Sequence, residues 1–181
     1  MVVVAVNFNF FWHQVRQVFR GTTNVIKISE PQTKNFIMEP DTLVITTLGI
    51  KVPVVYVSEE GEKFFQEALA GGVVHYPGSA LPGEVGNAYI FGHSSDYVWS
   101  KGKYKTVFAS LPEIQMGDEI YVSDASGKGF IYKVRASFVA KADEVSLLSQ
   151  ETNGGKILTL QTSWPLGTAL KRWIVRAEIE N

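Results

Sequence analysis

A series of short runs of β-branched and aromatic residues, separated by turn residues, constrains the fold of this 181-residue chain most strongly. The runs cover residues 43–47, 52–57, 88–92, 119–123, 130–140, 156–162 and 172–179. Residues 124–127, Asp-Ala-Ser-Gly, have the composition of a hairpin loop between two of these runs. Many short strands with few helices favour a closed barrel or a sandwich, so we expect a mostly β fold.

Helical patterns in the strand-rich part are few and short. Apolar residues at helical spacing predict a helix over residues 62–70, with Ser58 as its N-terminal cap. A second short helix is expected over residues 144–149. These helices are too few to form a layer of their own, so we expect them to pack on the β structure.

The N-terminal part of the chain has a different pattern. An aromatic stripe at helical spacing over residues 8–19 predicts an amphipathic helix packed against the domain, and a polar stretch follows it. We therefore divide the chain into an N-terminal helix and tether over residues 1–40 and one compact domain over residues 41–181. The apolar opening, residues 1–6, ends far short of the ~20 apolar residues that a membrane span requires. A spanning helix could have lain upstream, with this chain as the soluble remainder of an anchored protein.

Composition and charge exclude several classes of function. The net charge is −1, so the chain has no basic field for nucleic acid or an anionic membrane. It has no cysteine, which excludes disulfides and, with the residues as written, thiol catalysis. Its three histidines lack the spacing of a zinc site. Acidic Glu59, Glu60 and Glu62 could help to hold calcium, but carboxylates also favour a solvated helix start, and we prefer that interpretation.

Four short motifs occur in an order that resembles one protein family. They are His-Tyr-Pro-Gly-Ser-Ala at 75–80, Pro-Gly-Glu-Val-Gly-Asn at 82–87, a strand ending Gly-His at 92–93, and Thr-Leu-Gln-Thr-Ser at 159–163. Together they resemble the sortases, which are transpeptidases of bacterial surfaces, over residues from about 41 to 179. The resemblance implies a closed sortase-type β-barrel of about eight strands for this domain.

The resemblance also implies three catalytic residues. Acyl transfer from a peptide requires a nucleophile, a proton donor for the leaving amine, and a positive group near the developing oxyanion. The sortase nucleophile, acid/base and arginine correspond to Ser163, His93 and Arg172. Each has a plainer interpretation, respectively a turn serine, a hydrogen-bonded structural histidine and a surface ion-pair arginine. We interpret His75, in the turn before Tyr76 and Pro77, as structural.

The implied reaction is cleavage of a Leu-Pro-x-Thr-Gly-like sorting signal between Thr and Gly. An amine of a cell-wall precursor or of a pilin would then accept the protein, with no organic or redox cofactor. Gln161, Thr162 and Trp164, which flank the nucleophile position, are expected to bind substrate. The family acts on the outer side of the bacterial cell membrane, and residues 141–155 are expected to shape motif preference.

Serine at position 163 departs from the family pattern, which has cysteine there. A thiol loses its proton near pH 8.5, whereas a serine hydroxyl is far less acidic and needs a strongly coupled base. We therefore expect this form to be nearly inactive. Our hypothesis is that the natural protein has cysteine at this position and that the serine is an engineered substitution.

Two alternatives belong to other classes of protein. The first is a serine hydrolase that uses Ser163, His93 and an aspartate such as Asp96 or Asp143. Thr162-Ser163-Trp164 lacks the Gly-x-Ser-x-Gly turn that exposes a hydrolase serine, which disfavours this interpretation. The second is a non-catalytic peptide-binding module that keeps the groove of the sortase fold but not its thiol.

Overall fold

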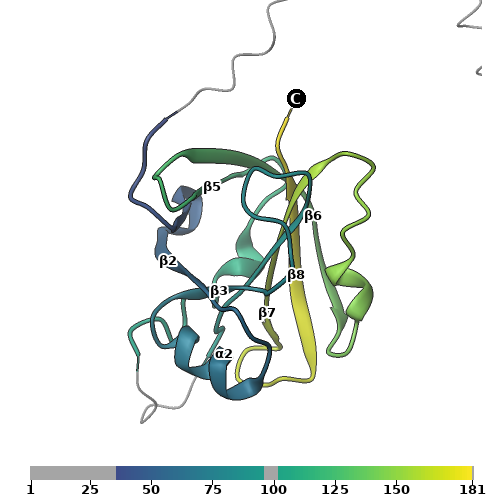
Figure 1. Cartoon of the computed structure of the whole chain (residues 1–181). Helices are drawn as coiled ribbons and strands as arrows, with labels where there is room; N and C mark the ends of the chain where they lie inside the picture. The colour runs from purple at the N-terminus through teal and green to yellow at the C-terminus, as the bar shows by residue number, and fades with distance from the viewer. Residues whose placement is uncertain (1–35, 96–101, 181) are drawn as a thin grey trace, which may run out of the picture. The chain divides into compact units, whose positions relative to one another are not determined.

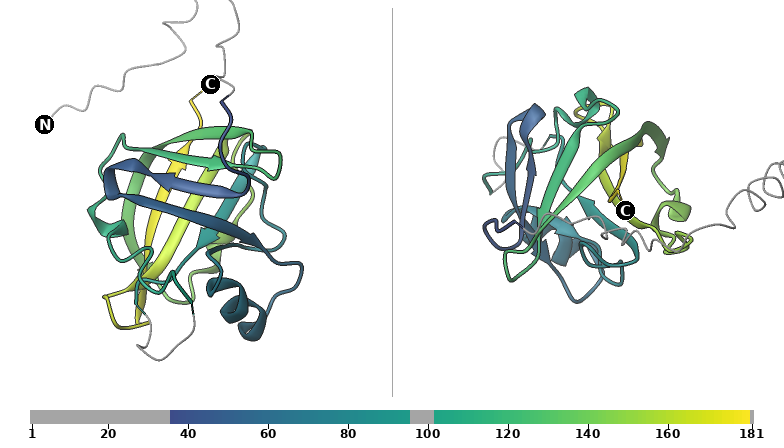
Figure 2. Two further views of the ribbon diagram at one scale, coloured as in Figure 1. Left: turned by 90° about the vertical axis from the view of Figure 1, so that its left-hand side faces the viewer. Right: turned by 90° about the horizontal axis from the view of Figure 1, so that it is seen from above.

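Residues 36–95 and 102–180 are described by a computed structural model of the chain. Within these ranges, eight strands form a closed barrel in the order β1-β2-β3-β4-β7-β8-β6-β5 (Figures 1 and 2). The strands are β1 (Thr42–Ile45), β2 (Ile50–Tyr56), β3 (Val73–His75), β4 (Gly86–Phe91), β5 (Glu119–Ser123), β6 (Gly129–Lys141), β7 (Lys156–Trp164) and β8 (Lys171–Glu178). The mostly β, closed-barrel fold expected from the sequence is confirmed. The helix predicted over residues 8–19 lies outside the described residues.

Most neighbouring strands of the barrel are antiparallel. The exceptions are the pairs β2–β3 and β4–β7, which are parallel. A parallel pair requires a long crossover connection, and α2 (Glu62–Leu69) lies in the connection from β2 to β3. The hairpin expected at residues 124–127 joins β5 to β6, and the Asp124 carboxylate accepts hydrogen bonds from the backbone N–H groups of Ser126 and Lys128.

The helices differ from the sequence predictions in two details. Ser58 does not cap α2: Gly61 occupies the N-cap position, and no side chain caps the helix. The second predicted helix is a short 3₁₀ helix, η3 (Val145–Leu148), and Leu147 is its buried residue. Two further 3₁₀ turns are η1 (Thr46–Leu48) and η2 (Leu111–Glu113). The buried residues of α2, Ala68 and Leu69, pack with Val74 of β3.

The strand predictions need three corrections. Strand β3 was not predicted, because its three residues are all buried and therefore show no alternation of apolar and polar positions. The first strand ends at Ile45, because the chain turns through η1 and left-handed Gly49. Strand β7 continues through Ser163 to Trp164, so Ser163 lies within a strand, and the connection to β8 spans only residues 165–170.

Alternation along three adjacent strands separates the core from the outer surface of the barrel. Ile90 of β4, Leu160 of β7 and Val175 of β8 belong to the main core cluster, and each is 0% exposed. Because successive side chains of a strand point to opposite faces, the residues on either side of these three point outward. The outward set includes Tyr89, Phe91, Gln161, Ile174 and the positions of Ser163 and Arg172. This outer face forms the floor of the candidate site.

Candidate active site

One cavity brings together His93, Ser163 and Arg172. It has a volume of about 520 Å³, and all three residues line it. They come from three places in the sequence: the turn after β4, the end of β7 and the start of β8. Residues of α2 and of the β6–β7 connection also line the cavity, and these two segments lie on either side of β7 and β8 in Figure 1. The barrel thus gathers the predicted nucleophile position, base and cation in one groove.

The pairing of β7 with β8 fixes the relation between Ser163 and Arg172. The two residues are direct partners in the antiparallel register, so their side chains leave the sheet on the same face. The Arg172 Nη1 donates hydrogen bonds to the carbonyl oxygens of Ala169 and Lys171, both at 3.0 Å. These bonds hold the guanidinium beside the β7–β8 connection. Among the described residues, Arg172 pairs with no carboxylate, so the surface ion pair considered above is not formed there.

His93 is held against β7 through its neighbour Gly92. The Gly92 N–H donates to the carbonyl oxygen of Gln161 at 3.0 Å, and the Thr162 hydroxyl donates to the carbonyl oxygen of Gly92 at 2.8 Å. The carbonyl oxygen of His93 accepts the backbone N–H of Phe108 at 2.9 Å. The backbone on both sides of the half-buried imidazole is therefore tied to the barrel.

A side chain at position 92 would disturb this arrangement. A Cβ atom placed there would lie 2.8 Å from a ring carbon of Phe108 and 2.8 Å from a methyl carbon of Val73. Such distances are shorter than van der Waals contact allows, so only glycine fits without displacing core side chains. The glycine of the Gly-His motif therefore has a packing reason.

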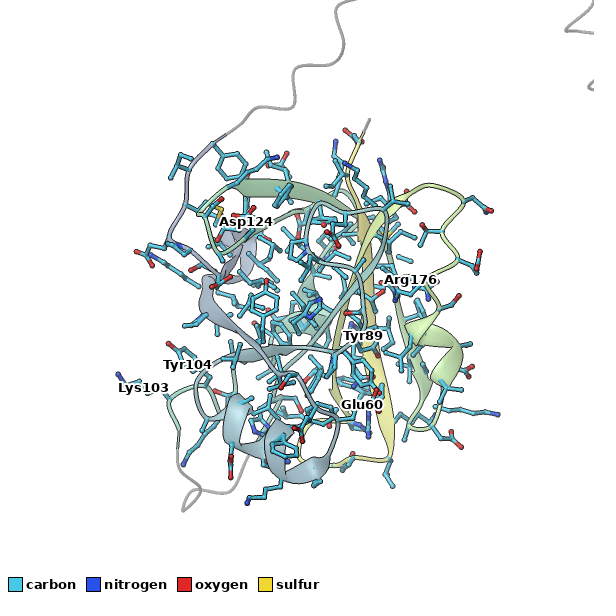
Figure 3. The ribbon with its side chains drawn as sticks, viewed as in Figure 1. Glu60, Tyr89, Lys103, Tyr104, Asp124 and Arg176 are labelled. Carbon is cyan, nitrogen blue, oxygen red and sulfur yellow. The ribbon has the colours of Figure 1, made fainter. Side chains whose placement is uncertain are left out.

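Tyr89, which the sequence analysis did not single out, lies in the wall of the same cavity (labelled in Figure 3). Its side chain is 3% exposed, and its hydroxyl donates a 2.6 Å hydrogen bond to Gln161 Oε1. Burial raises the pKa of Tyr89 above its usual range, although the positive charges of Arg172 and Arg176 act in the opposite direction. The hydroxyl therefore keeps its proton at neutral pH. A tyrosine inside an apolar strand carries no signal in the sequence beyond core packing.

An aromatic row continues the cavity wall from Tyr89. The rings of Tyr89 and Tyr76 lie 6.1 Å apart, those of Tyr76 and Phe65 5.9 Å, and those of Phe65 and Phe91 5.1 Å. Burial and a hydrogen bond with the Glu60 carboxylate both raise the pKa of Tyr76. The groove is thus largely aromatic on the side that faces α2.

The opposite wall is the β6–β7 connection, which is fastened to β4. The Asn87 side-chain nitrogen donates to the carbonyl oxygen of Leu147 at 2.9 Å. Gln150 Oε1 accepts the Asn87 backbone N–H at 3.0 Å, and Gln150 Nε2 donates to the Asn87 carbonyl oxygen at 3.2 Å. Asn87 therefore has a structural role, because these bonds hold the β6–β7 connection against β4. Three residues of this connection, Asp143, Glu144 and Leu148, line the cavity.

The residues predicted to bind substrate do not all lie in the groove. Gln161 and Thr162 line the cavity. Trp164 does not: it packs on Trp173, with ring centres 5.0 Å apart, and the Trp173 indole N–H donates to the Ser137 hydroxyl. Strand β7 extends through this position, and alternation places Trp164 on the other face from Ser163.

The remaining predictions concern other titratable residues. His75 is buried, with Nε2 2.8 Å from the carbonyl oxygen of Ala80, and burial lowers its pKa. Asp143 lines the cavity, whereas Asp96 lies outside the described residues. In the part of the chain that the structure describes, no group of three or more His, Asp or Glu side chains could hold a metal ion, and this includes Glu59, Glu60 and Glu62.

None of the helices within residues 36–95 and 102–180 has the length and apolar character needed to cross a membrane.

Comparisons with known proteins agree with the geometry. The family model of the sortase domain matches residues 43–180. Sortase C-1 from Actinomyces oris is 25% identical, with a TM-score of 0.64 and coverage of 77% of this chain and 72% of that chain. The Clostridium perfringens sortase D5 transpeptidase is 25% identical, with a TM-score of 0.62 and coverage of 77% and 78%. The pilus-related sortase C of Group B Streptococcus is also 25% identical, with a TM-score of 0.63 and coverage of 77% and 66%. A comparison with curated proteins found no match.

The matched region includes every strand of the barrel except the first residue of β1, and it contains the whole groove in which His93, Ser163 and Arg172 meet. This chain therefore belongs to the sortase family of cysteine transpeptidases.

Proposed function

We propose that this protein, with cysteine at position 163, cleaves a Leu-Pro-x-Thr-Gly-like sorting signal between Thr and Gly. It then transfers the threonine carbonyl to an amine of a cell-wall precursor or a pilin. The observation that carries the proposal is the single cavity lined by His93, position 163 and Arg172 in a chain of the sortase family. The similarity to a pilus-related sortase C supports a pilin as one acceptor.

In the proposed mechanism, the thiolate at position 163 attacks the threonine carbonyl carbon, and Arg172 stabilises the oxyanion that forms. The carbon–nitrogen bond then breaks, and the glycine amine leaves with a proton from His93. The acceptor amine attacks the thioester and gives up a proton to His93, and the thiolate is regenerated as the new amide forms. Gln161 and Thr162, which line the groove beside position 163, support a role in substrate binding.

Serine at position 163 makes the chain as it stands a poor catalyst in this scheme. Its hydroxyl is far less acidic than a thiol, so a serine nucleophile depends on a strongly coupled base. We attribute the serine to an engineered exchange of the natural cysteine, and a serine codon in the encoding gene would refute this. Activity on the outer side of the cell membrane, with an anchor before this chain, is part of the same proposal.

The test restores the thiol. Ser163→Cys protein is incubated with a library of Leu-Pro-x-Thr-Gly peptides and triglycine, and mass spectrometry identifies the cleaved bond and the acceptor. The proposal expects cleavage after Thr and a triglycine product. The control is Ser126→Cys, which places a thiol on the exposed β5–β6 hairpin and should cleave nothing.

Two other outcomes would favour the alternative functions. Specific labelling of Ser163 in the unchanged chain by a fluorophosphonate would favour a serine hydrolase. Tight peptide binding by Ser163→Cys protein without cleavage would favour a peptide-binding module, which the natural presence of serine would also support.

A further inference from the structure

The floor of the groove contains a polar pair in mainly aromatic surroundings. Tyr89 of β4 and Gln161 of β7 both line the cavity, and the Tyr89 hydroxyl donates to Gln161 Oε1 at 2.6 Å. In the parallel register Gln161 is the partner of Phe91, so Tyr89 lies diagonally across from it on the same face. The hydrogen bond thus spans two neighbouring strands and is independent of any loop.

This bond orients the Gln161 carboxamide. A carboxamide has one accepting oxygen and an NH₂ group with two donors. The Tyr89 hydroxyl keeps its proton because burial raises its pKa, and it uses that proton on the amide oxygen. The NH₂ group therefore points away from Tyr89. Among residues 36–95 and 102–180, no hydrogen-bond partner receives it, so it is a donor that a ligand in the groove can meet.

The position of this donor relates it to the reacting bond. Gln161 and Ser163 are two residues apart on the same face of β7, which corresponds to roughly 6–7 Å along a strand. An extended peptide advances about 3.3 Å per residue. For a peptide that extends along β7, the amide would therefore lie opposite a peptide group within about two residues of the carbonyl at which position 163 reacts.

We propose that Tyr89 is a positioning residue that holds the Gln161 amide as a hydrogen-bond donor to an oxygen of the sorting peptide within about two residues of the scissile bond. A peptide without that acceptor would leave the NH₂ group desolvated and unpaired among aromatic side chains, which weakens binding. The pair thus makes the groove selective for an acceptor at this position. The inference rests on the proposed function in one respect, that the groove binds the sorting peptide.

The first experiment measures binding to the chain as it stands, because Ser163 permits binding without turnover. Fluorescence anisotropy would report Kd for labelled Leu-Pro-Gln-Thr-Gly-Gly and for forms that each lack one acceptor. Replacing Gln by Leu or Thr by Val removes a side-chain oxygen, and a thioamide at the Gln or Thr carbonyl weakens a backbone acceptor. We expect one of these changes to raise Kd by about tenfold. The change that does so shows whether the oxygen that accepts from Gln161 belongs to a side chain or to the backbone of the peptide.

The second experiment uses variants of the pair. Tyr89→Phe and Gln161→Leu should each raise Kd for the parent peptide by about tenfold, and the double variant should bind no worse than Gln161→Leu alone. For each variant, the parent peptide and the altered peptide that binds the unchanged chain more weakly should have the same Kd. Tyr121→Phe is the matched control, since its hydroxyl donates to the Glu119 carboxylate on a different part of the barrel. If the Tyr89 hydroxyl had only a structural role, Tyr89→Phe would lower the melting temperature but would still distinguish the two peptides.

Each outcome separates this inference from the proposed function. Equal Kd values for all peptides, undiminished discrimination by Tyr89→Phe, or no peptide binding at all would overturn the inference. If the Ser163→Cys protein cleaves peptides while any of these results holds, the proposed function stands without it. If discrimination depends on Tyr89 but Ser163→Cys protein cleaves nothing, the inference stands and the transpeptidase proposal fails.

Discussion

Ser163 and Arg172 are direct partners in the antiparallel register of β7 and β8. A pair of hydrogen-bonded strands is among the most rigid supports that a protein offers to a reacting group. The guanidinium also donates to two backbone carbonyl oxygens, that of Ala169 in the connection and that of Lys171 at the start of β8. The distance between Ser163 and Arg172 therefore depends on the register of β7 and β8.

Removal of the Arg172 guanidinium should harm catalysis more than stability. In a Ser163→Cys background, Arg172→Ala should lower kcat/KM by roughly 10²–10³-fold, the loss typical of one oxyanion-stabilising donor. Arg172→Lys should restore little of the lost kcat/KM, because lysine lacks the planar fork of donors of the guanidinium. Peptide cleavage and melting temperature are to be measured on the same samples. Arg135→Ala is the control, since Arg135 forms an exposed ion pair with Glu180, and near-normal cleavage by folded Arg172→Ala would remove Arg172 from the mechanism.

The Thr162 hydroxyl should matter through its bond to Gly92. Thr162→Val keeps the shape of the side chain but removes the 2.8 Å hydrogen bond that ties the His93 turn to β7. We expect a loss of about 1 kcal/mol in the free energy of unfolding. We also expect a fall of roughly tenfold in kcat for Ser163→Cys protein, because the imidazole loses its placement. Thr42→Val is matched to it, since the Thr42 hydroxyl donates to the Pro40 carbonyl away from the cavity and should affect stability alone.

A methyl group at position 92 should be poorly tolerated. Gly92→Ala would place Cβ 2.8 Å from both Phe108 and Val73, so core side chains or the backbone before His93 must move. We expect the free energy of unfolding to fall by about 1–3 kcal/mol. Urea unfolding should be compared with that of Gly71→Ala, where the nearest atom would lie at 3.4 Å. Equal stability of the two variants would contradict this account of the Gly-His motif.

His75 should make the fold less stable in mild acid. Its Nε2 faces the Ala80 carbonyl oxygen, which only accepts, so the neutral ring donates there. Burial lowers the pKa of His75 below the ordinary histidine value of about 6.5. The unfolded state then binds more protons than the folded state as pH falls below about 6.5, and the free energy of unfolding decreases. Urea titrations at pH 5.0 and 7.5 should show a smaller pH dependence for His75→Gln than for the unchanged chain. Identical pH dependence would argue that the pKa of His75 is the same in the folded and unfolded states, which would contradict the effect of burial.

Strong alternation and turn residues made most of the barrel predictable. The Asp124 hairpin and the long runs that became β4, β6 and β8 follow directly from such patterns. Strand β3 escaped because three consecutive buried residues have no period. The end of β7 was placed too early, at Thr162, because the sequence does not show where the strand stops; the strand continues to Trp164, whose side chain does not line the cavity.

The site was predictable only in its chemistry. The positions of His93, Ser163 and Arg172 could be found from the motifs that resemble the sortases, and the three line one cavity, but their catalytic roles stay predictions. Tyr89 could not be found from motifs, since its bond to Gln161 joins two strands whose pairing is a tertiary property. The same holds for Asn87 and Gln150, which hold the β6–β7 connection against β4 from positions far apart in the sequence.

Intact-mass spectrometry of the Ser163→Cys protein can detect the proposed acyl intermediate at position 163. The protein is mixed with a Leu-Pro-x-Thr-Gly peptide in the absence of an amine acceptor and quenched in acid at short times. The proposed mechanism predicts an adduct at position 163 with the mass of the peptide portion that ends at Thr, and its loss on addition of triglycine. Cleavage between Thr and Gly with no adduct at position 163, or no reaction with any peptide of the library, would contradict a transpeptidase that acts through this residue.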